Sequence, residues 1–331
     1  MQQARRKTSV LRIVSRLLLL FIVPVIIIGT VAAVAGKNYY DLYDWYKLRD
    51  YTPSVEVTKL ADDSYMTDSA RKVFYVHDPK INDKVEFNQN CPFAERTFVL
   101  GCYTGANIYL LDVKEERLAS VETVTAAHEM LHATYSRLPI KERENVDRLL
   151  SEAFARQTDK RLIDLVAEYR KHDPGSVPNE LHSILGTEVA SLSPELEEYY
   201  DQYFTNRKEL VAQYKGYEDV FAGLEKRIEV LQAEINSSSA RIKQLEVDIK
   251  STREKISAVN SRLDQFDASG DVSSYNALVP EQNRLVNDHN TEFRSYEALI
   301  NTHNNNVKKI NEIVIQKNSL VNSIDSKFEA I

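Results

Sequence analysis

An uninterrupted heptad pattern in the second half of the chain limits its fold more than any other feature. Apolar residues recur at alternating steps of four and three between Leu210 and Phe266, which is the spacing of a coiled-coil seam. A turn, DASGDVSS, follows, and a second helical pattern then comprises Phe293, Tyr296, Ile300, His303, Val307, Ile310, Val314, Lys317, Val321, Ile324 and Phe328. Two long helices joined by so short a turn are predicted to fold back as an antiparallel hairpin over residues 201–331.

The seam of this predicted hairpin is not wholly apolar. From Leu224 to Phe266 the first arm would span about 60 Å at 1.5 Å per residue. Polar side chains interrupt the two seams at Ser238, Thr252, His303 and Lys317. These interruptions weaken the seam, so the sequence indicates either a mobile hairpin or one that binds a further coiled-coil partner.

The N-terminal region is apolar and is preceded by basic residues. No charged residue occurs from Leu17 to Ala35, a length that suits a helix crossing a bilayer of about 30 Å. The residues before it include Arg5, Arg6, Lys7, Arg12 and Arg16, and the aromatic stretch NYYDLYDWY follows it. Residues 1–36 are therefore predicted to be a cytoplasmic stub and a single-pass anchor in the cell membrane, with the Tyr/Trp cluster at the outer interface.

A cleaved signal peptide is the alternative interpretation, because Ala33-Val34-Ala35 is an acceptable cleavage site. Both interpretations place residues 37–331 outside the cytoplasm. Cys91 and Cys102 would then form a disulfide in an oxidising compartment, although two buried thiols remain the alternative. The net charge of −7 argues against a nucleic-acid partner, which usually meets a basic face.

Residues 37–200 read as a mixed α+β domain. KVFYVHD, RTFVLGCY and NIYLLDV are short β-branched and aromatic runs typical of strands. The pattern becomes helical from Val121, with Ser120 or Thr123 as an N-cap, and that helix ends at Pro139. A second helix is expected over roughly 140–171 and a third near Asn179.

The segment HEMLH, from His128 to His132, is the one sharp chemical motif. Residues four apart share a helix face, so the two imidazoles can bind one Zn²⁺. Glu129 follows the first histidine and can reach a zinc-bound water as its general base. The alternative is a helix with two satisfied histidines and a glutamate that faces solvent.

Through His128, Glu129 and His132 the chain resembles the zincin superfamily of zinc metallopeptidases. The resemblance covers roughly residues 70–200. It implies that the histidines bind zinc, that Glu129 polarises the water, and that an edge strand, here NIYLLDV, holds the peptide substrate by β-augmentation. Tyr135 stands where the longer HExxHxxGxxH motif has glycine. A third histidine of that type is thereby excluded, and a glutamate ligand of the gluzincin type is favoured.

Three glutamates are candidates for the third zinc ligand. Glu180 is preferred because NELHS matches an Asn-Glu-x-x-Ser pattern and begins a helix after a flexible loop. Glu152 would overshoot the metal if its helix runs antiparallel to the histidine helix. Glu188 lies two turns beyond Glu180, about 12 Å further along the same helix.

The sequence thus predicts an α+β fold with one transmembrane helix, a zincin-like metallopeptidase domain over 37–200 and a coiled-coil hairpin over 201–331. The expected activity is a membrane-anchored extracytoplasmic zinc endopeptidase, with a protein or peptide substrate and the lipid bilayer as its partners. The alternative function is a non-catalytic coiled-coil scaffold with a degenerate zincin domain. The intact Glu129 favours the enzyme, because a scaffold has no need of a base beside two ligands.

Overall fold

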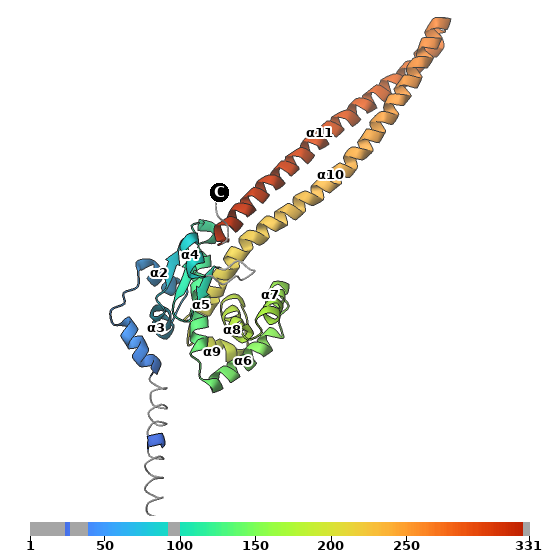
Figure 1. Cartoon of the computed structure of the whole chain (residues 1–331). Helices are drawn as coiled ribbons and strands as arrows, with labels where there is room; N and C mark the ends of the chain where they lie inside the picture. Colours follow the sequence, from blue (N-terminus) through green and yellow to red (C-terminus); the bar gives the residue numbers. More distant parts are fainter. Residues whose placement is uncertain (1–23, 27–38, 92–99, 327–331) are drawn as a thin grey trace, which may run out of the picture. The chain divides into compact units, whose positions relative to one another are not determined.

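The computed structural model describes residues 24–26, 39–91 and 100–326. A helix of residues 39–48 precedes the labelled elements (Figure 1). Those elements are α2 (Val55–Asp63), α3 (Asp68–Val76), β1 (Lys80–Asn82), α4 (Lys84–Asn90), β2 (Gly101–Tyr103), β3 (Ile108–Leu111), the 3-10 helix η1 (Glu116–Leu118), α5 (Ser120–Ser136), α6 (Ile140–Phe154), α7 (Lys160–His172), α8 (Val177–Glu188), α9 (Pro194–Tyr200), α10 (Arg207–Ser269) and α11 (Val272–Ile324).

These elements form two compact units. The first unit comprises Met1–Asp112 and Val121–Gln213, and the second comprises Val113–Ser120 and Tyr214–Ile331. The predicted HEMLH helix is α5, in the first unit. Twelve of its 17 residues are buried, so this helix forms the centre of the core of the first unit. Ala126, Ala127 and Ala133 are fully buried along it, and their small side chains allow neighbouring elements to approach closely.

A small sheet packs in the same unit, with strand order β1-β3-β2. β1 pairs with β3 in parallel, with Ile81 opposite Leu110. β2 pairs with β3 in antiparallel fashion, with Cys102 opposite Tyr109. The prediction that NIYLLDV is an edge strand is therefore wrong: β3 lies in the middle of the sheet, and β2 is the edge.

Two secondary-structure predictions are also wrong, both because a side chain caps a helix. KVFYVHD, predicted as a strand, lies mostly in α3, where the Thr67 hydroxyl accepts the N–H of Ala70 and Phe74 is fully buried. The single helix expected over 140–171 is divided into α6 and α7. The Asp159 carboxylate accepts the N–H groups of Arg161 and Leu162 and so starts α7 as a new helix.

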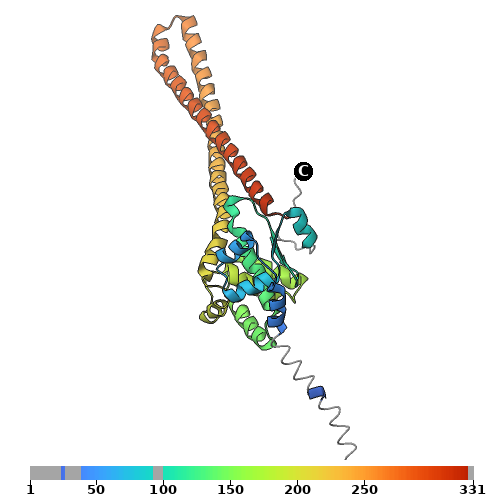
Figure 2. The ribbon, with the colours of Figure 1, turned by 90° about the vertical axis from the view of Figure 1, so that its left-hand side faces the viewer.

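The second unit contains α10 from Tyr214 onward together with α11, and these two arms run antiparallel (Figures 1 and 2). Near the turn, Gln282 donates a hydrogen bond to Asn260, and far from the turn Lys317 pairs with Glu225. On the turn side of the hairpin, Val259, Leu263, Leu278 and Leu285 form a buried apolar cluster, against which Phe266 and Tyr275 pack.

The seam of α10 is buried at predicted positions such as Leu245 and Ile249, but the predicted seam of α11 is only partly right. Its predicted member Ile324 is buried, whereas Phe293, Val307 and Val314 are exposed. The other buried residues of α11 are Leu278, Leu285, Asn306, Ile313 and Leu320. They belong to a neighbouring row that was not predicted, although it also fits a four-three spacing with Ile324.

The predicted fold class is wrong. The described residues are mostly helical, and their only sheet has three strands of three or four residues each. This architecture does not correspond to the expected α+β zincin-like domain behind a transmembrane helix. No helix among the described residues is long and apolar enough to cross a membrane. The span predicted over residues 17–35 lies outside the described residues except for 24–26.

Candidate metal centre

The two histidines of α5 lie side by side, as their spacing of four predicts. The ring centroids of His128 and His132 are 4.7 Å apart, with the ring planes at 77°. His132 is almost fully buried, and the His128 side chain retains 21% exposure. Both Nε2 atoms are directed toward the same neighbouring helix, α8, and toward the same carboxylate.

That carboxylate belongs to Glu180, in the first turn of α8. Its Oε2 lies 4.0 Å from His128 Nε2 and 3.8 Å from His132 Nε2. A close approach of α8 to α5 makes this arrangement possible. A Cβ atom on Gly186 would lie 2.5 Å from Leu131 Cδ1 and 2.8 Å from Tyr200 Cε1, so a larger residue there would require Leu131, Tyr200 or α8 itself to shift.

The three side chains fit a zinc ion. Their ligand atoms all lie within 4.8 Å of one another. A tetrahedral zinc with bonds near 2.1 Å separates two ligand atoms by roughly 3.3 Å, so each side chain would move inward by only a fraction of an ångström. Two imidazoles and one carboxylate also form a ligand set that leaves the fourth position open for water or substrate, as catalytic zinc sites require.

The two competing glutamates lie elsewhere. Glu188 forms an ion pair with Arg161 at 2.6 Å, and Glu152 pairs with Arg148 at 2.8 Å on an exposed face of α6. Among the described residues, His128, His132 and Glu180 form the one group that could hold a metal ion.

Glu129 lies in the same cleft, on the side of the edge strand β2. The side chain is buried, and a Cβ atom on Gly101 would lie 2.8 Å from its Cγ and 2.9 Å from its Oε1. A glycine at position 101 is therefore what allows β2 to pass this close to the glutamate. The cleft has a volume of about 200 Å³, and Tyr103, Tyr169 and Asn179 also line it.

Burial disfavours the charged forms of His128 and Glu180 when no metal is bound. Desolvation lowers the pKa of His128 well below its usual value, and the neighbouring His132 and His182 lower it further. Desolvation also raises the pKa of Glu180 to about 7, although a hydrogen bond from Tyr169 lowers it in part. Neutral imidazoles are the form that binds zinc, whereas the glutamate must lose its proton as the metal arrives.

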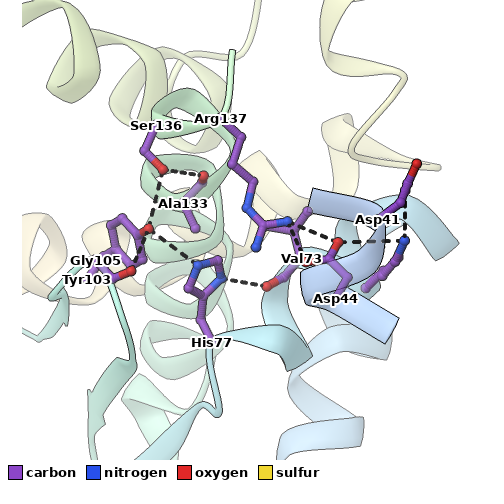
Figure 3. A network of polar contacts seen from close by, with 10 residues as sticks. Asp41, Asp44, Val73, His77, Tyr103, Gly105, Ala133, Ser136 and Arg137 are labelled. Atoms are coloured by element: carbon purple, nitrogen blue, oxygen red, sulfur yellow. Dashed lines mark hydrogen bonds and ion pairs between the residues drawn. The ribbon is translucent and has the colours of Figure 1, made fainter. Parts of the chain in front are cut away.

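The disulfide between Cys91 and Cys102 is present and forms part of the cleft wall. It ties the end of α4 to β2. Tyr103, the next residue of β2, lies 3.3 Å from both His77 Nε2 and Ser136 Oγ through its hydroxyl (Figure 3). The edge strand is thus fixed on both sides, by the disulfide and by a polar contact to the last residue of α5.

Sequence reasoning missed several residues of this site. Tyr169 contacts Glu180 from α7, and no pattern in the sequence relates the two. His182 lies fully buried two residues after Glu180, where its Nε2 is 2.8 Å from the hydroxyl of Tyr199. Burial lowers the pKa of His182 to about 3. The only signal for His182 was its place within NELHS, next to the preferred ligand.

Comparison with known proteins does not assign the chain to a family. The chain matches no family model, no curated protein and no solved structure. Any function must therefore be argued from the residues of the cleft and their geometry.

Proposed function

We propose that the chain is a zinc-dependent peptide hydrolase, with His128, His132 and Glu180 as the metal ligands and Glu129 as the general base. The convergence of Glu180 on the two histidines from a different helix is the observation that supports the proposal most strongly. A surface carboxylate would be solvated or paired with a basic residue, as Glu152 and Glu188 are. Glu180 is instead largely buried next to two imidazoles.

The metal ligands, Glu129 and Tyr169 would have different roles in the hydrolysis of a peptide bond. A bound zinc ion would lower the pKa of a water molecule and polarise the substrate carbonyl. Glu129 would be the general base that accepts a proton from the attacking water, and it would return that proton to the departing amine when the C–N bond breaks. Tyr169 donates a hydrogen bond to Glu180 and so helps to orient that ligand.

The edge strand suggests how a peptide would lie in the cleft. β2 pairs with β3 on one side and has no strand of the described sheet on the other. An extended substrate segment can use that second side for backbone hydrogen bonds, as in β-augmentation. Gly101, Cys102 and Tyr103 all border the cleft, so a chain bound along β2 would pass the metal ligands.

The disulfide supports a place for this activity outside the cytoplasm. Disulfides persist in secreted and extracytoplasmic proteins and are rare where thiols are kept reduced. Cys91 and Cys102 are bonded, and the chain has no other cysteine. We therefore retain an oxidising compartment as part of the proposal.

The variant Glu129→Gln tests the proposed reaction. The amide keeps the size of the side chain but cannot accept a proton, and general-base catalysis contributes about 10²–10⁴-fold. We expect one zinc per chain by elemental analysis and a loss of hydrolysis of that size on a peptide library. Glu144→Gln, on the exposed face of α6, is the matched control and should cleave like the wild type. Wild-type cleavage by Glu129→Gln would overturn the mechanism.

A further inference from the structure

The helix of residues 39–48 exposes large apolar side chains and buries one charged side chain. Its large apolar side chains face outward: Tyr39 is 59% exposed, Leu42 68%, Trp45 60% and Tyr46 61%. Of its two acidic residues, Asp41 is exposed, but Asp44 is only 3% exposed. A helix on the surface of a water-soluble protein normally buries its apolar stripe and exposes its charges.

Buried polar contacts hold the inner face of this helix against the first unit. Arg137 Nη1 lies 3.0 Å and 3.1 Å from the two carboxylate oxygens of Asp44 (Figure 3). Lys72 lies 3.6 Å from the same carboxylate, and the guanidinium of Arg137 stacks on the ring of Tyr40 at 4.9 Å. Removing either partner of such a buried pair is costly because the other charge is left uncompensated. The rotation of the helix is therefore fixed, with Tyr39, Trp45 and Tyr46 outward.

The chemistry of the outer face fits a lipid bilayer better than a protein. Tyrosine and tryptophan are enriched where a membrane meets water, because their rings are apolar and their polar atoms reach the headgroups. Basic groups border the rings: Lys47 Nζ lies 5.9 Å from the ring centre of Tyr43, and the Arg49 guanidinium lies 5.5 Å from that of Tyr46. The sequence from Leu17 to Ala35, just before the helix, contains no charged residue.

We propose that the outer face of the helix of residues 39–48 docks on the headgroup region of a lipid bilayer. Such a helix lies in the plane of the interface with its apolar side chains among the upper acyl carbons. Arg137 directly follows α5, the helix that carries His128 and His132. The ion pair of Arg137 with Asp44 would therefore hold the cleft of the first unit close to the membrane surface. This proposal does not depend on the chain being a hydrolase.

Trp45 makes the test direct, because it is the only tryptophan of the chain. The full-length protein is reconstituted with phosphatidylcholine and phosphatidylglycerol vesicles, and its emission is recorded without zinc or substrate. We expect emission at a shorter wavelength than that of tryptophan in water. We also expect stronger quenching by lipids brominated near the headgroup than by lipids brominated near the bilayer centre. A matched reporter, Trp45→Phe with Val55→Trp, places the indole on another exposed position of the first unit and should respond to iodide in water instead.

Three outcomes would overturn the proposal. Trp45 could remain accessible to iodide in the vesicles. Its emission could already lie at a short wavelength without lipid and show no quenching by brominated lipids, which would mean that protein covers this face. The Val55→Trp reporter could be quenched by brominated lipids as strongly as Trp45, which would mean that the whole surface adsorbs to the vesicle.

Discussion

Replacing Glu180 by Gln should stabilise the metal-free protein while abolishing its metal binding. Burial raises the pKa of Glu180 from 4.5 to about 7. Below 4.5 the carboxyl is protonated in both the folded and the unfolded state and costs nothing. As the pH rises from 4.5 to 7, the unfolded state gives up its proton first, so the free energy of unfolding falls, and above 7 the loss is complete.

The size of the effect follows from the two pKa values. The difference between 4.5 and about 7, at 1.36 kcal/mol per pKa unit, amounts to roughly 3 kcal/mol. The side chain is only 12% exposed, so little of this is lost to solvent screening. Glutamine has the same shape and no charge, and it can still accept the hydrogen bond of Tyr169. Near pH 8 the variant should therefore be more stable than the wild type by up to this amount, and near pH 4.5 the two should be equal.

Amide hydrogen exchange of α8, followed by mass spectrometry in the presence of a chelator, measures the free energy of local opening. Glu152→Gln, which removes an exposed carboxylate of α6, is the control and should shift the opening free energy by less than about 1 kcal/mol at either pH. Two results would refute this reasoning. The α8 amides of Glu180→Gln could be no better protected than those of the wild type near pH 8, or the gain in protection could be the same at both pH values. Either result would mean that ionisation of the buried carboxyl does not destabilise the folded state.

Two further predictions concern the cleft and the hairpin. Gly101→Ala should keep zinc but lose about 10²-fold in peptide cleavage, because the added Cβ would displace Glu129 or β2. Gly223→Ala is the control, because a Cβ there meets no atom within 4 Å, and it should cleave like the wild type. A Gly101→Ala variant with wild-type activity would contradict the close packing of β2 against Glu129. Leu245→Asp puts a charge into the seam of α10 and should lower the free energy of unfolding by more than the 2–5 kcal/mol typical of Leu→Ala. Circular dichroism would record this loss as a lower midpoint of thermal melting. Zinc content should remain one per chain, because the ligands belong to the first unit.

Part of the site could be predicted from local sequence because helix geometry alone determines it. Two histidines four residues apart share a face in any α-helix, so the pairing of His128 with His132 required no tertiary information. The four-three spacing of apolar residues in α10 is also a local pattern. It places these residues on one face of the helix, which the opposite arm of the hairpin then covers.

The third ligand could not be deduced in this way. Glu152 lies on α6, whereas Glu180 and Glu188 lie on α8, so the choice between them depends on how these two helices pack against α5. Gly186 allows close packing of α8 near Leu131. Sequence distance gives no measure of that packing.

The strands and the N-terminal helix show the same limit. β-branched runs predicted both α3 and β3 as strands, and only the Thr67 cap and the burial of Phe74 distinguish the helix from the strand. The aromatic residues of 39–48 were evident in the sequence, but their direction was not. It depends on an ion pair between Asp44 and Arg137, which lie 93 positions apart.

Zinc stoichiometry in single glutamate variants tests the metal centre most directly. Glu180→Ala, Glu188→Ala and Glu152→Ala are prepared at equal concentration, dialysed against the same zinc buffer and analysed by native mass spectrometry. We expect one zinc per chain in the wild type, in Glu188→Ala and in Glu152→Ala, and a large loss of zinc in Glu180→Ala alone. Full zinc occupancy in Glu180→Ala, or an equal loss in all three variants, would contradict this expectation.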